Sequence, residues 1–131
     1  MVIKTESQVL QLEKRWAELK YEVLEKDPAI YQKIRILLKD KATPNEILFN
    51  TLIQEALAQE AHTGRQLNAL QHVWGYFKTC ATPEEKAAFE NKHHLWLTHQ
   101  IELNQLKQDL LSLAIKYQME YLLNSSYLNK L

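Results

Sequence analysis

Glycine and proline are scarce in this sequence, with only two glycines and three prolines among 131 residues. β-rich and loop-rich proteins depend on these residues at their turns, because glycine reaches positive φ and proline presets the turn. The scarcity therefore excludes most such folds and predicts an all-α protein. Hydrophobic residues make up 46% and charged residues 24%, as in ordinary globular chains. A chain of this length is expected to form a single domain over residues 1–131.

An excess of charge and a pair of cysteines are also missing. The 16 basic and 16 acidic residues cancel, so no overall field attracts nucleic acid or an anionic membrane, and any RNA binding must use a local patch. The single cysteine, Cys80, excludes an internal disulfide and a cysteine-ligated iron–sulfur cluster. No stretch reads as a signal peptide or a membrane span. We therefore expect a cytoplasmic protein with no membrane contact and no cofactor.

Metal ligands and catalytic motifs are sparse as well. The chain holds one Glu-x-x-His pair, Glu90 and His93, whereas di-iron helical bundles use two such pairs and further carboxylates. No His-Glu-x-x-His, glycine-rich phosphate loop or Ser-His-acid pattern occurs. The sequence thus predicts no metal site and identifies no catalytic residue.

Capping residues mark the helix starts. Asp27, Thr43 and Thr82 each precede a proline, which loses nothing at the first helical position because the N–H there has no partner within the helix. Thr5 with Gln8 predicts a capping box that opens a first helix over residues 6–25. The second helix is expected over 28–39, the third from Pro44 and the last from Pro83.

The third helix is expected to end where Thr63 and Gly64 break the pattern. Its predicted inward face comprises Ile47, Leu48, Leu52, Ile53, Ala56 and Leu57. From Pro83 to about Leu123 no strong breaker occurs, and apolar residues recur at seven-residue spacing. So long a helix is unusual in a globular domain. The pattern predicts a bundle of five or six helices with a long C-terminal helix that either bends near residues 91–94 or pairs with a second copy.

The stretch 68–78 carries two faces of one predicted helix. Its apolar face comprises Leu67, Leu70, Val73, Trp74 and Phe77, and we expect it to share one core with Trp16. On the polar face Asn68, His72 and Gly75 follow at i, i+4 and i+7. A mid-helix glycine costs roughly 1 kcal/mol relative to alanine. Close packing of a neighbouring helix is the favoured explanation for it, and close approach of a ligand is the alternative.

A family resemblance rests on this stretch. The motif Asn68-x-Leu70-x-His72-Val73-x-Gly75-Tyr76-Phe77-Lys78, followed by Thr82-Pro83-Glu84-Glu85-Lys86, resembles the signature of the YbgA-like domain family. Further blocks resemble that family: Trp16-Ala17-x-x-Lys20-Tyr21, Asp27-Pro28-x-x-Tyr31 and Tyr121-Leu122-x-x-x-x-Tyr127-Leu128. The family is a small bacterial domain, found alone or fused to a TudS-type thiouridine desulfidase domain. This chain departs from it at Leu19, where the family has histidine, at Arg35, where glycine is frequent, and over 94–102, where the family carries proline.

Aromatic and basic residues interleave around these motifs. Single-stranded RNA is commonly held by rings that stack on bases and cations that contact phosphates. The candidate RNA-binding residues are Lys20, Tyr21, Tyr31, Arg35, Arg65, Asn68, His72, Gly75, Tyr76 and Lys78. We expect five of these residues to lie together on one surface: Lys20, Tyr21, His72, Tyr76 and Lys78. The resemblance implies that the RNA is tRNA and that a TudS-type desulfidase acts in trans.

Two other functions stay open. One is a small enzyme of unnamed substrate that uses Asn68, His72 and Tyr76 as a polar site, with the histidine as general acid or base. It would show a concave pocket lined by these three residues. The other is a protein-interaction module that forms a homodimer through its last helix. It would show a concentration-dependent mass and no affinity for RNA.

Overall fold

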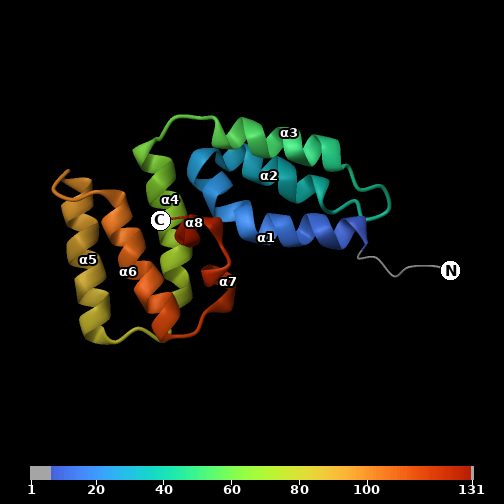
Figure 1. Ribbon diagram of the computed structural model, residues 1–131. Coiled ribbons are helices and arrows are strands. Elements are labelled where there is room, and N and C mark those ends of the chain that lie inside the picture. Colours follow the sequence, from blue (N-terminus) through green and yellow to red (C-terminus); the bar gives the residue numbers. More distant parts are fainter. Residues whose placement is uncertain (1–6, 131) are drawn as a thin grey trace. The chain divides into compact units, whose positions relative to one another are not determined.

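The structure is a computed structural model that describes residues 7–130, and within them it holds helices and no strand (Figure 1). The elements are α1 (Gln8–Lys26), α2 (Pro28–Leu37), α3 (Glu46–Leu57), α4 (Thr63–Trp74), the 3-10 helix η1 (Gly75–Phe77), α5 (Pro83–Leu97), α6 (Leu103–Lys116), α7 (Glu120–Leu123) and α8 (Ser126–Asn129). The all-α prediction is confirmed. The described part of the chain forms eight α-helices instead of the predicted five or six.

The chain divides into two compact units within α4. The first unit ends at Ala69 and the second begins at Leu70. Helices α1 to α3 and most of α4 belong to the first unit, and the remaining elements belong to the second. The single domain expected from the length of the chain stays a prediction.

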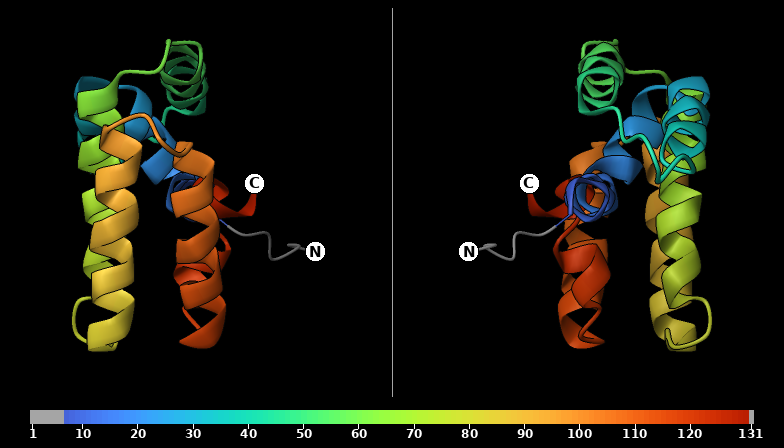
Figure 2. Two further views of the ribbon diagram at one scale, coloured as in Figure 1. Left: turned by 90° about the vertical axis from the view of Figure 1, so that its left-hand side faces the viewer. Right: turned by 90° about the vertical axis from the view of Figure 1, so that its right-hand side faces the viewer.

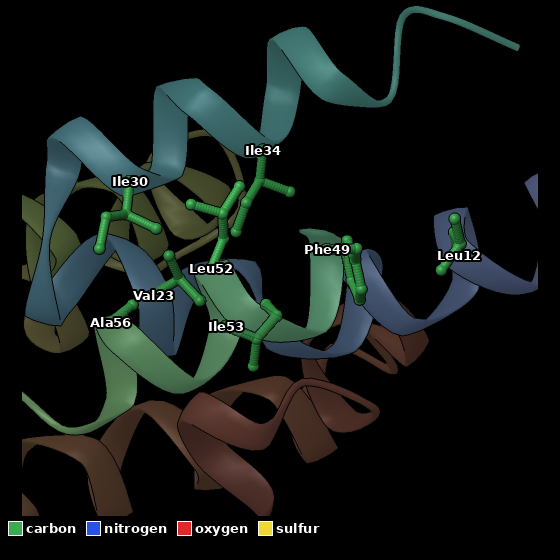
Figure 3. Close-up of a cluster of buried hydrophobic side chains, with 8 residues drawn as sticks. All are labelled: Leu12, Val23, Ile30, Ile34, Phe49, Leu52, Ile53 and Ala56. Carbon is green, nitrogen blue, oxygen red and sulfur yellow. The ribbon is translucent and has the colours of Figure 1, made fainter. Parts of the chain in front are cut away.

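Three helices of the first unit pack around one hydrophobic core. Side chains from α1, α2 and α3 point into the space between these helices (Figure 3), and the core comprises Leu12, Val23, Ile30, Ile34, Phe49, Leu52, Ile53 and Ala56. Trp16, Leu19, Tyr31, Leu37, Leu38 and Leu57 are half-buried around it. Each of the three helices therefore contributes one apolar face to this core. Trp16 packs on this core, while Leu70, Val73 and Phe77 are fully buried residues of the second unit.

The starts of α1 and α2 are set by side-chain caps. Ser7 precedes α1, and its hydroxyl accepts a hydrogen bond from the N–H of Leu10 at 3.1 Å. Thr5, the predicted cap, lies outside the described residues. Asp27 caps α2 as predicted, because its Oδ1 accepts from the N–H of Ala29 at 2.9 Å and Pro28 opens the helix. The second helix ends at Leu37, two residues before its predicted end.

Helix α3 begins later than predicted. Asn45, not Thr43, is the cap, and its side chain accepts from the N–H of Leu48 at 3.0 Å. Thr43 instead donates its hydroxyl hydrogen to the carboxylate of Asp40 in the preceding turn. The inward face is partly wrong, since Ile47 is 82% exposed and Leu48 is 41% exposed. The stripe that faces the core runs through positions 49, 52, 53 and 56, which share one side of a helix.

The break before α4 also lies elsewhere than predicted. Helix α4 starts at Thr63, so Thr63 and Gly64 form its first turn, and the chain leaves helical geometry over residues 58–62. A single glycine in the first turn of a helix costs little, so Gly64 does not interrupt α4. The presence of glycine was therefore a poor marker of the boundary between α3 and α4. The 3-10 helix η1 continues directly from α4 through Phe77.

The second unit contains a helical hairpin where the sequence predicted one long helix. Helix α5 ends at Leu97, the chain turns over residues 98–102, and α6 returns antiparallel beside α5 (Figure 2). His99 takes a left-handed φ of 60° in the turn, a conformation that histidine adopts more readily than most residues. At the start of α6 the Oε1 of Gln105 then accepts a hydrogen bond from the N–H of Glu102 at 2.9 Å, as in a capping box. The predicted bend near residues 91–94 is wrong, since that segment is regular α5.

The apolar seam of the sequence is divided between the two arms of this hairpin. Trp96 on α5 and Leu106 and Leu110 on α6 are buried, and α5 packs on α6. Gln118, two residues after the end of α6, has a φ of 53° and leads into the short helices α7 and α8. The long helix that suggested a dimer is therefore absent from the described chain, and homodimerisation itself stays a prediction. None of the helices described has the length and hydropathy that crossing a membrane requires.

Glu85 ties the start of α5 to the end of α6. It forms the predicted capping box with Thr82, and the Nζ of Lys116 donates to its Oε2 at 2.8 Å. The hydroxyl of Tyr117 donates to its Oε1. These bonds, with the N–H of Thr82, hold the pKa of Glu85 at about 2, below its ordinary value of 4.5. The same carboxylate raises the pKa of Lys116 and that of Tyr117.

Acid is expected to weaken the α5–α6 hairpin. Because the pKa of Glu85 is lower in the folded state, its contribution to stability is present above pH 4.5 and is lost as the pH falls through about 2. Glu85→Gln should flatten this part of the pH dependence of the melting temperature measured by circular dichroism. Glu84→Gln is the matched control, since Glu84 lies exposed in the same first turn. Equal pH profiles for the two variants would contradict the role given to Glu85.

Candidate nucleic-acid interface

The two units divide the predicted site residues between them. The first unit holds Lys20, Tyr21, Tyr31, Arg35, Arg65 and Asn68, and the second holds His72, Gly75, Tyr76 and Lys78. The convergence of Lys20 and Tyr21 with the residues of the second unit stays a prediction.

Tyr31 and Arg35 lie together on α2. They are spaced i, i+4, and the guanidinium carbon of Arg35 lies 5.9 Å from the ring centroid of Tyr31. The ring of Trp16 lies on Tyr31 with its centroid 5.3 Å away. Arg35 is exposed and Tyr31 is half-buried. This pair combines a ring with an accessible cation, as a nucleotide contact requires.

Tyr21 does not offer its ring to a ligand. It is only 6% exposed, so almost none of the ring is left for stacking on a base. Lys20 is half-buried, and its Nζ lies 5.2 Å from the centroid of the Tyr21 ring. Of these two neighbours, only Lys20 is accessible to a ligand, and the buried ring of Tyr21 contributes to packing.

Arg65 holds the first unit together. Its Nη1 donates to the carbonyl of Lys26 at 3.0 Å and to the Oε1 of Gln59 at 3.0 Å. The Nζ of Lys26 donates to the carbonyl of Gln59 at 3.1 Å, and the amide of Gln59 donates to Asp27. Partial burial alone would raise the pKa of Asp27, but the bonds from Gln59 and the first N–H groups of α2 outweigh it and lower that pKa. The guanidinium of Arg65 is thus already engaged where α1 ends.

Two exposed tyrosine rings stack in the second unit. The centroids of Tyr76 on η1 and Tyr121 on α7 lie 6.2 Å apart, with the planes inclined by 16°. Tyr76 is 36% and Tyr121 41% exposed. His72 is also exposed and lies one turn before Tyr76. We call Tyr76 and Tyr121 the tyrosine pair.

Gly75 opens η1 beside the tyrosine pair and is exposed. A Cβ built at this position would meet nothing within 4 Å, and its φ is not positive. Close packing against a neighbouring helix, the favoured explanation for this glycine, is therefore wrong. The backbone here is open enough for the close approach of a ligand, which was the alternative.

Lys78 follows η1 and lines a cavity of about 360 Å³. The other lining residues are Gln71, Trp74, Phe89, Glu90 and His93. Lys78 shares this cavity with one face of α4, whereas Tyr76 stacks on α7. The central motif thus presents two separate features, the tyrosine pair and the cavity.

Tyr121 is the residue that the sequence did not assign to the site. It opens the C-terminal block of the family resemblance, which marked it without giving it a role. No periodicity connects it to Tyr76, because the two belong to different elements far apart in the chain. Only the fold of the second unit brings their rings together.

The two alternatives, a small enzyme and a homodimer, stay predictions. Asn68 and His72 lie one turn apart on α4, and Tyr76 follows on η1. Within residues 7–130, no three His, Cys, Asp or Glu side chains gather as a metal site would need.

Comparison with known proteins gives one match. The model of a family described as "Protein of unknown function (DUF1722)" matches residues 20–131. Neither the curated proteins nor the solved structures give a match.

Proposed function

We propose, from the premise that the chain belongs to the DUF1722 family of proteins of unknown function, that it is a cytoplasmic bacterial domain that binds tRNA. The observation that carries this proposal is the tyrosine pair. Two exposed parallel rings give a platform for base stacking, which tolerates any sequence because every base has a π-face. Exposed His72 adds a hydrogen-bonding ring one turn away.

The zero net charge of the chain is compatible with RNA binding through a small local surface. Because the formal net charge is zero, stacking and a few cations must supply the affinity that a basic protein obtains from its overall field. Exposed Lys78 in the second unit and exposed Arg35 beside Tyr31 in the first supply such cations. Each unit thus carries aromatic and cationic groups suited to a nucleic-acid strand.

The choice of tRNA rests on the YbgA-like resemblance. Relatives in that family are fused to a TudS-type domain that acts on thiolated uridine. This chain has one cysteine, so it lacks the set of thiolates that an iron–sulfur cluster normally needs. In this proposal the chain holds the RNA, and a TudS-type desulfidase acts in trans as its partner.

Replacing both members of the tyrosine pair by alanine is expected to weaken tRNA binding by at least about tenfold. Base stacking on an aromatic side chain contributes roughly 1–3 kcal/mol per base, and both rings are exposed. The measurement is a filter-retention titration of tRNA at low salt with the wild type and Tyr76→Ala/Tyr121→Ala.

Ile115→Ala is the matched control, because Ile115 is a 61% exposed apolar residue of the second unit outside the pair. It should bind tRNA as the wild type does. Lys78→Ala should reduce the slope of affinity against salt by about one unit, while Lys86→Ala should leave it nearly unchanged. Wild-type protein that retains no tRNA at low salt would end the proposal.

A further inference from the structure

The cavity beside Lys78 lies between α4 and α5, within the second unit. Gln71 and Trp74 come from α4, and Phe89, Glu90 and His93 come from α5. Its volume of about 360 Å³ lies at the small end of the range for small-molecule sites, roughly 300–1,000 Å³. A ligand that enters it must therefore be small.

Parallel rings form the wall of this cavity. Trp74 and Phe89 stack with their centroids 4.0 Å apart and their planes inclined by 7°. Phe89 and His93 follow at 5.8 Å and 6°. Trp74 and Phe89 are buried, so the stack is fixed by the fold before any ligand arrives. A preformed wall of this kind suits a flat ligand, which loses little entropy on binding.

Polar groups surround that wall. Glu90 is an exposed acceptor, Lys78 is an exposed donor, and the amide of Gln71 is both. The Nε2 of His93 is buried and has no hydrogen-bond partner among the residues described. An unpaired buried polar atom destabilises a fold, so such an atom normally has a protein group, a bound water or a ligand as its partner. A ligand with donors and acceptors on its edge would supply the missing partner.

We infer that this cavity receives one unstacked nucleobase, taken from the RNA of the proposed function on which this inference rests. A base is planar, is of suitable size, and carries both donors and acceptors around its edge. Trp74 and Phe89 line the site that receives the base, and His93, Glu90, Gln71 and Lys78 offer donors and acceptors to its edge. The tyrosine pair holds the strand by sequence-tolerant stacking, and the cavity reads one base.

Other occupants fit less well. A metal ion would need a third ligand beside Glu90 and His93, and no group of three such side chains occurs in the described part of the chain. An aliphatic ligand would leave the buried imidazole nitrogen of His93 without a partner. The same base chemistry is also offered by a free nucleotide, which the experiment separates from RNA.

The test compares His93→Phe with His94→Phe. Phenylalanine at position 93 keeps a flat ring stacked on Phe89 and removes only the nitrogens, so the variant should fold with unchanged or higher stability. His94 is exposed and does not line the cavity, which makes it the matched control. Melting curves of both variants establish that they are folded.

Two measurements are made on each protein. The first is tRNA affinity by filter retention, in which His93→Phe should bind about tenfold more weakly than His94→Phe, as expected for the loss of one hydrogen bond made by a buried atom. The second is the change in NMR signals of the cavity residues on titration with the four nucleoside monophosphates and with ribose 5-phosphate, which has no base. The nucleotides should shift these signals in the wild type, and ribose 5-phosphate should not.

The outcomes distinguish this inference from the proposed function. If the wild type binds tRNA but His93→Phe and His94→Phe bind it equally, the cavity does not read a base and only the RNA-binding proposal stands. If nucleotides shift the cavity signals while tRNA is not retained, the base comes from a free nucleotide, and the source inferred here is wrong. Equal shifts from ribose 5-phosphate would show phosphate binding and overturn base recognition.

Discussion

Replacing Phe77 by alanine is expected to lower the free energy of unfolding by about 3 to 5 kcal/mol. Phe77 has 0% exposure, so its removal forfeits the burial of a whole ring and leaves a cavity. The ring lies near those of Trp74 and Tyr117, with centroids 6.0 and 6.5 Å away. Both partners belong to the second unit, and neither can fill the space without leaving its own contacts. Urea unfolding followed by circular dichroism measures the loss.

Tyr76→Ala is the control for this prediction. Tyr76 is the preceding residue on the same 3-10 turn, but it is 36% exposed and its ring stacks at the surface. Its replacement should cost much less, because surface positions rarely exceed about 0.5 kcal/mol. A loss below about 1 kcal/mol for Phe77→Ala would show that the apolar face of this stretch has been assigned wrongly.

Arg65→Met is expected to destabilise the protein by about 1.5 to 3 kcal/mol, the range for hydrogen bonds made by a charged group. Methionine keeps most of the apolar stem but removes the donors to the carbonyl of Lys26 and to Gln59. It also removes the positive charge that helps to lower the pKa of Asp27, so that pKa should rise. Thermal and urea unfolding measure the stability, and NMR titration follows the carboxyl of Asp27.

Arg35→Met is the matched variant for this second prediction. Arg35 is exposed and lies over the ring of Tyr31, so its loss should change stability by less than about 0.5 kcal/mol. Its tRNA affinity should fall, whereas that of Arg65→Met should hold at temperatures where the variant is folded. Equal stability of the two variants would contradict the structural role given to Arg65. A selective loss of tRNA binding in Arg65→Met would show that Arg65 contacts RNA instead.

The candidate site was predicted in part. The central motif pointed to His72, Gly75, Tyr76 and Lys78, and the structure places all four at the surface. Tyr21 and Arg65 carry the same residue types but serve packing and a hydrogen-bond network. Sequence pattern could not separate these cases, because an amphipathic ring or a guanidinium suits both a surface and an interior.

Local chemistry determined much of the helix pattern. Asp27 with Pro28, and Thr82 with Pro83, begin helices as predicted, since a cap and a proline act through bonds to the next few residues. The spacing of the core residues on α2, Ile30 and Ile34, likewise follows the 3.6-residue period of a helix. These features involve neighbours in the chain and require no knowledge of distant contacts.

Tertiary structure decided where the apparently continuous last segment breaks and what its residues contact. No glycine or proline marks the turn at His99, because a left-handed φ at one histidine costs little compared with the burial gained when α5 packs on α6. The same folding brings Lys116 and Tyr117 to Glu85, and Tyr121 to Tyr76. By itself the sequence determined an all-α protein and the starts of several helices. The hairpin, the tyrosine pair and the wall of the cavity depend on contacts between distant residues, which only packing selects.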